Sequence, residues 1–253
     1  MKTISSRRNP ICVHLKKLGS SGSYRKQTGE FLCDGIKLLE EAVNYGADIS
    51  VVLTTKDIPI KLKDDVDVYY VESALLNSLS SLKNSQDILF SCKIPEPESL
   101  SDISGTHILL VNLQDPGNVG TIIRTANAFG IKSVMLTADC ADPYNPKTIR
   151  GTMGSIFRQN IKTVSHNDLI AYKNKGKKII GAALSNDCRD FREITYENTI
   201  IAIGNEGAGL PDFILDLCDE KVVIPIAKES ESLNAAVAAS IIMCEAKHYV
   251  KKG

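Results

Sequence analysis

The stretch that most constrains this chain is an apolar run that leads directly into a glycine-rich loop. The run Thr199–Ile203 is followed by Gly204-Asn-Glu-Gly-Ala-Gly209, and Leu210-Pro211 closes the loop. A short apolar run bounded by turn residues predicts a buried strand, and the glycines predict a tight loop whose backbone can approach a ligand closely. The spacing G-x-x-G-x-G is neither the dinucleotide fingerprint nor a phosphate-binding P-loop. Taken alone, the loop is compatible with a ligand site or with a plain turn.

Strand and helix patterns alternate on both sides of this loop. In the second half of the chain we expect strands at 107–112, 133–137, 179–183, 199–203 and 221–225, and helices at 119–129, 147–155, 212–218 and 233–246. The first of these strands, at 107–112, has a continuous apolar run, as in a strand that is covered on both faces. This alternation predicts an α/β fold with a mainly parallel sheet and helices on both of its faces.

The first ninety residues predict a smaller α/β unit. We expect helices near 10–18, 35–44 and 72–82, an exposed loop at 18–25, and strands at 50–55, 66–71 and 88–92. A proline-containing, acidic stretch follows and is typical of a linker. We therefore predict a first domain at 1–95, a linker at 96–102 and a second domain at 103–253.

The charges are unevenly distributed although the formal net charge is zero. No acid precedes Glu30, and a second acid-free window runs between Asp142 and Asp168. The basic residues that we single out in these two windows are Arg7, Arg8, Arg25, Lys26 and Arg150. They form either ordinary solvated faces or local patches for a polyanion such as RNA, whose phosphates bind Lys and Arg in a salt-dependent manner.

Two further features bear on location and chemistry. The N-terminus lacks the apolar core of a signal peptide and no run of eighteen apolar residues occurs, so we expect a cytoplasmic protein. Seven cysteines are scattered without a C-x-x-C pair, so we expect reduced thiols, no disulfide framework and no structural zinc site.

Three motifs, in this order and spacing, carry a resemblance to a known family. They are Asn118-Val-Gly-Thr-Ile-Ile-Arg124, Gly204-Asn-Glu206-Gly-Ala-Gly-Leu210, and Ile224-Pro-Ile226 with Ser232-Leu-Asn234. Together they resemble the signature motifs of the SpoU (TrmH-type) RNA 2′-O-ribose methyltransferases of the SPOUT superfamily. The resemblance implies a C-terminal sheet with a trefoil knot, a ribosomal-protein-like RNA-binding domain before it, and a homodimer formed through the catalytic domain.

The resemblance also implies S-adenosyl-L-methionine as the cofactor, RNA (most often ribosomal RNA) as the partner, and no metal. The implied catalytic residues are Arg124, Asn118, Glu206, Ser232 and Asn234, and the implied cofactor-binding residues are Gly204, Ile224, Leu233, Ile203, Asn205 and Ile226. An arginine is a poor general base because its pKa lies above about 12, so electrostatic stabilisation by Arg124 is easier to defend. Ser232 and Asn234 also have a plain alternative role as helix caps.

Three alternatives stay open at this point. An RNA-binding or ribosome-assembly factor could keep the fold without catalysis, and a ribose methyltransferase could act on transfer RNA instead. A small-molecule α/β enzyme with an unrelated nucleotide cofactor is the third, although the dinucleotide fingerprint is missing. Binding of S-adenosylmethionine separates the third alternative from the others.

Overall fold

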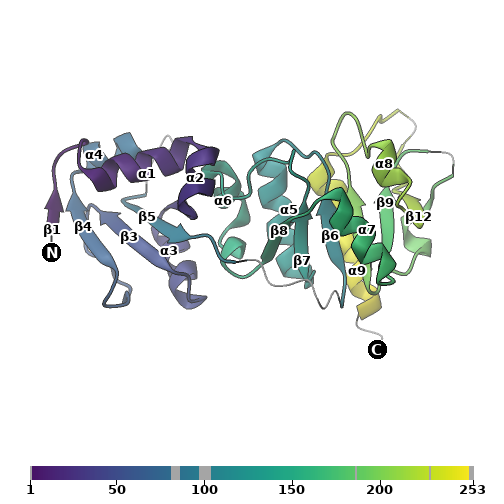
Figure 1. Ribbon diagram of the computed structural model, residues 1–253, viewed down its shortest axis with the longest axis horizontal. Helices are drawn as coiled ribbons and strands as arrows, with labels where there is room; N and C mark the ends of the chain where they lie inside the picture. The colour runs from purple at the N-terminus through teal and green to yellow at the C-terminus, as the bar shows by residue number, and fades with distance from the viewer. Residues whose placement is uncertain (1, 81–85, 97–103, 186, 228, 251–253) are drawn as a thin grey trace. The chain divides into compact units, whose positions relative to one another are not determined.

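The protein, described by a computed structural model, forms two compact units (Figure 1). The structure describes residues 2–80, 86–96, 104–185, 187–227 and 229–250. Unit 1 comprises Met1–Glu96 together with Asp142–Arg158, and unit 2 comprises Pro97–Ala141 and Gln159–Gly253. Apart from Glu96, the predicted linker lies outside the described residues. The segment Asp142–Arg158 belongs to unit 1 although it interrupts the sequence of unit 2.

Unit 1 is built on a five-stranded mixed sheet with the order β1-β4-β3-β5-β2. The strands are β1 (Lys2–Ile4), β2 (Glu30–Asp34), β3 (Ile49–Thr54), β4 (Asp67–Val71) and β5 (Ile88–Lys93). Strand β4 runs parallel to β1 and β3, whereas β5 runs antiparallel to β2 and β3. The helices are α1 (Pro10–Ser20), α2 (Gly22–Thr28), α3 (Ile36–Asn44) and α4 (Ser73–Leu79). Leucines of α1 and α4 pack with those of the sheet in one buried core.

The prediction of an exposed loop at 18–25 is wrong, because helix α2 begins at Gly22. Ser21 caps this helix by accepting a hydrogen bond from the Tyr24 amide, and Gly29 ends it in the left-handed conformation with φ 66°. A Ser/Gly-rich stretch is typical of loops, but serine is also a favoured N-cap and glycine a favoured helix terminator. At the N-terminus, Lys2–Ile4 form strand β1, which the basic composition of this stretch did not indicate.

Two ion pairs and an aromatic contact anchor the segment Asp142–Arg158 within unit 1. The buried guanidinium of Arg25 donates to Asp142 Oδ2 from Nε at 2.8 Å and from Nη2 at 2.6 Å. Arg158 pairs with Glu41 at the other end of the segment. Tyr144 packs against Phe31, with ring centroids 5.0 Å apart. Between these anchors lie helix α6 (Pro146–Thr152) and a short 3-10 helix, η1 (Ser155–Phe157).

Unit 2 is built on a seven-stranded sheet in which every strand pairing is parallel. Its order is β10-β12-β9-β11-β6-β7-β8. The strands are β6 (His107–Leu110), β7 (Ser133–Leu136), β8 (Asn160–Thr163), β9 (Lys178–Ala182), β10 (Arg189–Asp190), β11 (Thr199–Ile203) and β12 (Glu220–Val223). The predicted α/β fold with a mainly parallel sheet is therefore confirmed, while the trefoil knot stays a prediction.

Helices cover both faces of this sheet (Figure 1). They are α5 (Pro116–Phe129), α7 (His166–Asn174), α8 (Asp212–Leu215) and α9 (Ala235–Val250), and a 3-10 helix, η2, spans Phe191–Glu193. One core joins Leu109 and Ile200 of the sheet to Leu169 of α7 and Ile214 of α8. Helices α5 and α9 pack against each other through buried apolar side chains. No helix in the described part of the chain is long and apolar enough to cross a membrane.

Strand β8 and helix α7 have no counterpart in the predicted elements. The signal for α7 is a capping box, in which the Ser165 hydroxyl accepts from the Asp168 amide while the Asp168 carboxylate accepts from the Ser165 amide. This pattern is readable in sequence as Ser-x-x-Asp. The apolar periodicity that should accompany it is weak, because only Leu169 and Tyr172 of this helix are buried.

Candidate active site

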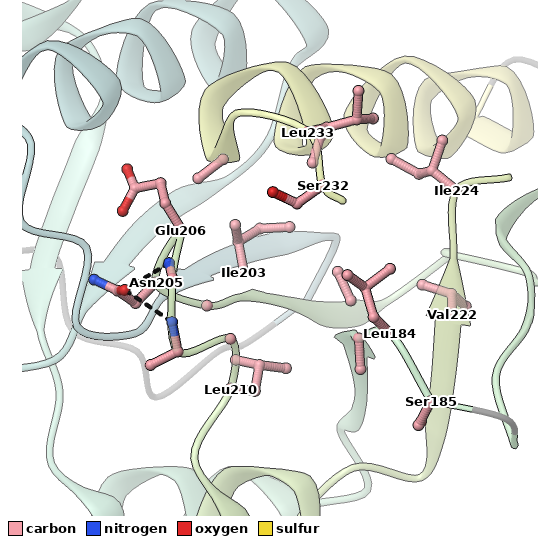
Figure 2. Close-up of a pocket in the computed structure, with 18 of the residues that line it drawn as sticks. Leu184, Ser185, Ile203, Asn205, Glu206, Leu210, Val222, Ile224, Ser232 and Leu233 are labelled. Carbon is pink, nitrogen blue, oxygen red and sulfur yellow. Dashed lines mark hydrogen bonds between the residues drawn. The ribbon is translucent and has the colours of Figure 1, made fainter. Parts of the chain in front are cut away.

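A pocket of about 560 Å³ lies in unit 2 where strands β9, β11 and β12 end (Figure 2). The carboxyl ends of parallel strands are the usual ligand-binding edge of an open α/β sheet, and this volume suits a small organic ligand. The walls come from residues 182–185 at the end of β9 and residues 203–210 at the end of β11 and in the glycine-rich loop. Val222, Ile224 and Ile226 line the pocket at and after β12, and Glu231, Ser232, Leu233, Ala235 and Ala238 line it before and within α9.

The glycine-rich loop is a closed turn on one side of the pocket. The amide of Asn205 donates to the Gly209 carbonyl at 3.1 Å, and the amide of Gly209 donates back to the Asn205 carbonyl at 2.9 Å. Asn205 Oδ1 accepts from the amides of Gly207 and Ala208, as the dashed lines in Figure 2 show. A Cβ atom at Gly204 would overlap the carbonyl group of Gly209, so the chain can close here only with glycine.

The six residues predicted to bind the cofactor all line this pocket. They are Ile203, Gly204, Asn205, Ile224, Ile226 and Leu233. Leu184 also lines it and leaves 68% of its surface exposed, so a ligand in the pocket would cover an apolar side chain that now faces solvent. Leu184 is not among the residues predicted from the motifs, although its place directly after a predicted parallel strand is a signal for a ligand-binding position.

A chain of hydrogen bonds joins three of the predicted catalytic residues. Asn118 Nδ2 donates to Glu206 Oε1, and Asn234 Nδ2 donates to Asn118 Oδ1 at 3.1 Å. Asn234 Oδ1 accepts from the Ala236 amide at 2.9 Å, so this residue also caps helix α9. The relay Glu206–Asn118–Asn234 thus ties together the glycine-rich loop, the first turn of α5 and the start of α9.

The other two predicted catalytic residues are not members of the relay. Ser232 lines the pocket. Arg124 is exposed on α5, and its guanidinium has neither a hydrogen bond nor an ion pair with any residue that the structure describes. Because helical residues seven apart share a face, Arg124 lies on the same face as Gly117 in the first turn of α5. Its cation is therefore available to a bound anion.

One of the residues predicted to bind RNA must be corrected. Arg25 is only 3% exposed, and its Nη1 donates to the Leu18 carbonyl at 2.6 Å while its other nitrogens hold Asp142. A guanidinium used in this way holds unit 1 together, so we remove Arg25 from the RNA-binding set. Arg7, Arg8, Lys26 and Arg150 are exposed, and all four belong to unit 1.

The described residues contain no cluster of three or more His, Cys, Asp or Glu side chains that could hold a metal ion. The seven cysteines, all of them in the described ranges, form no disulfide. A Cβ atom at Gly181 in β9 would lie 2.7 Å from the sulfur of Cys218, and burial raises the pKa of the Cys218 thiol to about 11. A thiol with that pKa stays protonated at neutral pH and is a poor nucleophile.

Comparison with known families agrees with this fold and site. The model of the SpoU rRNA Methylase family matches residues 105–244, and the model of an MRM3-like substrate binding domain matches residues 2–89. The parallel sheet, the pocket at its carboxyl edge and the relay belong to the first match. The chain belongs to the SpoU rRNA Methylase family, as the three motifs had suggested.

Individual relatives match nearly the whole chain. The 23S rRNA (guanosine(2553)-2′-O)-methyltransferase RlmP of Bacillus subtilis is 35% identical over 96% of this chain and 98% of its own length. The 23S rRNA (uridine(2479)-2′-O)-methyltransferase of Streptomyces viridochromogenes is 30% identical, covering 88% of this chain and 84% of its own. The AdoMet-bound rRNA methyltransferase from Sinorhizobium meliloti superposes with a TM-score of 0.87 at 28% identity, covering 98% of both chains.

Proposed function

We propose that this protein transfers the methyl group of S-adenosyl-L-methionine to a ribose 2′-hydroxyl of large-subunit ribosomal RNA in the cytoplasm. The observation that carries the proposal is the pocket with its neighbouring relay, in which the predicted cofactor residues and three predicted catalytic residues come together. The two relatives named above modify 23S ribosomal RNA at different bases. Their shared substrate supports the RNA class, and their difference leaves the base to experiment.

The residues of the pocket fit the proposed cofactor. Apolar side chains of Ile203, Ile224 and Leu233 offer walls for an adenine ring. Gly204 lets the loop close beside them, because a side chain there would collide with the Gly209 backbone. S-adenosyl-L-methionine, when bound, supplies an electrophilic methyl group on a positively charged sulfur. Glu206 and Ser232 contribute polar side chains to the pocket wall, and the relay holds Glu206 in place.

Arg124 is proposed to act on the RNA. In this reaction the 2′-hydroxyl would give up its proton to solvent as its oxygen bonds to the methyl carbon, and the electrons of the broken carbon–sulfur bond would stay on the sulfur. Negative charge would therefore develop on the ribose oxygen as the proton leaves and before the new bond is complete. A fixed cation beside that oxygen, or beside the adjacent phosphate, stabilises the charge. The guanidinium of Arg124 is exposed and is not engaged by any described residue, so it can serve in this way without first breaking an ion pair.

Mapping of ribose methylation tests the proposed function and its alternatives. Ribosomal and transfer RNA from cells with and without the protein would be compared at every nucleotide. We expect one 2′-O-methyl group in the large-subunit RNA to be lost with the gene and restored by the wild-type chain. A lost site in transfer RNA would instead support the transfer-RNA enzyme. Unchanged methylation together with an assembly defect would support the inactive factor.

We also propose that unit 1 recognises the RNA. Alanine at Arg7 and Arg8, or at Lys26 and Arg150, should weaken RNA binding and lower its salt dependence, with each lost phosphate contact reducing the log–log slope by about one. All four side chains are exposed, so their removal should leave the fold intact. Fluorescence titrations at several salt concentrations measure both quantities.

The matched control replaces Lys175 and Lys178, two exposed cations of unit 2. This pair should leave the slope unchanged. Equal effects from the control pair, or a loss of cofactor affinity without a loss of RNA affinity in the unit 1 variants, would contradict the assignment of RNA binding to unit 1.

A homodimer through the catalytic unit is the third part of the proposal. Most apolar side chains of α9 are buried inside unit 2, but Val237 is 47% exposed, and Ile241 and Cys244 are partly exposed on the same helical face. This stripe follows the spacing i, i+4, i+7 of a helix contact. Glutamate at Val237 and Ile241 should convert the protein to a monomer in analytical ultracentrifugation. A wild-type protein that sediments as a monomer at micromolar concentration would refute the homodimer.

A further inference from the structure

Asn112, two residues after the end of strand β6, has an uncommon backbone conformation. Its φ is 54°, in the left-handed region, where only three other non-glycine residues of the described chain have a positive φ: Asp87, Met153 and Asn198. Such a conformation costs free energy and persists only where the surroundings hold it, and it is often found at functional sites. Asparagine tolerates it better than most residues.

Three hydrogen bonds hold Asn112 in this conformation. Its amide donates to Thr137 Oγ1 at 3.0 Å, and that hydroxyl donates to Asn112 Oδ1 at 3.3 Å. Its carbonyl accepts from Asn205 Nδ2 at 3.0 Å. The last bond reaches across from the end of β6 to the glycine-rich loop that follows β11, 93 residues further along the chain.

The bond to Asn112 engages the nitrogen of the Asn205 side-chain amide, so that both polar atoms of this side chain have partners. Asn205 Nδ2 is bonded to the Asn112 carbonyl, while Oδ1 accepts from the amides of Gly207 and Ala208. The side chain therefore has one orientation that satisfies all these partners, and the Asn112 carbonyl selects it. Glu206 lies between the anchored residues of this loop and accepts from Asn118.

We propose that Asn112 is a positioning residue of the methyltransferase site. Its left-handed backbone aims its carbonyl at Asn205, and this contact fixes the loop that forms one wall of the cofactor pocket and carries Glu206 to Asn118. The inference rests on the proposed function only in taking the pocket as the S-adenosyl-L-methionine site. It concerns the backbone of Asn112, because the contact to Asn205 uses no atom of the Asn112 side chain.

Two substitutions at Asn112 separate the backbone from the side chain. Asn112→Gly deletes the side chain but adopts a positive φ freely, whereas Asn112→Val is β-branched and strongly disfavours it. The matched control is Asn198→Val, because Asn198 has a φ of 56° but precedes β11 at the opposite edge of the same sheet, where its side chain accepts from the Gly105 amide.

Calorimetric titration with S-adenosyl-L-methionine should show a dissociation constant about tenfold or more above wild type for Asn112→Val, and within about threefold for Asn112→Gly. Asn198→Val should lower the melting temperature but keep cofactor affinity. In the ligand-free protein, amide hydrogen exchange at Gly207 and Ala208 should accelerate in Asn112→Val alone. This second readout does not require the cofactor or methyl transfer.

Unchanged exchange at Gly207 and Ala208 in Asn112→Val would overturn the inference, as would a glycine variant as impaired as the valine variant. Equal loss of affinity in Asn198→Val would reduce the effect to general destabilisation. Failure of the proposed function has a different signature, since a wild-type protein that leaves ribosomal RNA unmethylated could still show the expected exchange pattern. The two failures are therefore distinguishable.

Discussion

Arg124→Ala is expected to slow single-turnover methyl transfer to saturating RNA by roughly a hundredfold or more, because a cation aimed at developing negative charge contributes on the order of 3 kcal/mol to lowering the barrier. The side chain is exposed and has no partner among the described residues, while Ile122 and Ala126 of the same helix form the core. The variant should therefore melt within a few degrees of wild type. Its affinity for S-adenosyl-L-methionine should be nearly normal, since Arg124 does not line the pocket.

Two further variants sharpen the test of Arg124. Arg124→Lys should restore activity only in part, because an ammonium group cannot reproduce the planar two-pronged donor of a guanidinium. Lys175→Ala removes an exposed cation elsewhere in unit 2 and should leave the rate unchanged. Near-wild-type turnover by Arg124→Ala would return Arg124 to the role of an ordinary surface arginine.

Gly204→Ala is expected to abolish measurable cofactor binding. The added methyl group would overlap the Gly209 carbonyl and lie 2.5 Å from the amide nitrogen of Leu210, and both obstacles are backbone atoms. The loop must open to admit it, which breaks the paired hydrogen bonds between Asn205 and Gly209. Overpacking of this kind typically costs about 1–3 kcal/mol or more, and here the displaced backbone is itself a wall of the pocket.

Gly207→Ala provides the matched control in the same loop. A methyl group there would come no closer than 3.7 Å to Asn205 Oδ1, which is ordinary contact, and Gly207 does not have a positive φ. Calorimetric titration should therefore give this variant a cofactor dissociation constant within about threefold of wild type. Normal binding by Gly204→Ala, or equal loss in both variants, would show that the loop is not held closed as the structure describes.

Much of unit 2 was predictable because its signals are local. Strands buried on both faces give continuous apolar runs, and the high glycine content of residues 204–209 indicates a loop. The residues assigned to the pocket, such as Gly204 and Leu233, came from family motifs, and the structure places them together. The relay was harder to predict from the sequence, since a motif does not say that Glu206 accepts a hydrogen bond from Asn118 rather than from Arg124.

The features that escaped prediction depend on contacts between distant parts of the sequence. Arg25 lies in a basic stretch, and only its pairing with Asp142, 117 residues away, reveals that it is buried. The same pair brings the segment Asp142–Arg158 into unit 1, which no composition shift marks. Asn112 gives no sequence signal either, because its role depends on a carbonyl direction that is set by Thr137 and Asn205.

Transfer of labelled methyl groups tests directly whether the protein methylates a ribose 2′-hydroxyl. Unmodified large-subunit ribosomal RNA would be incubated with wild-type protein and methyl-labelled S-adenosyl-L-methionine, digested to nucleosides, and analysed by mass spectrometry, with Arg124→Ala as the parallel sample. We expect the label in a single 2′-O-methylated nucleoside with the wild-type protein, and strongly reduced labelling with the variant. Label in a base-methylated nucleoside, or no labelled RNA from a protein that binds the cofactor normally, would contradict ribose methylation at this site.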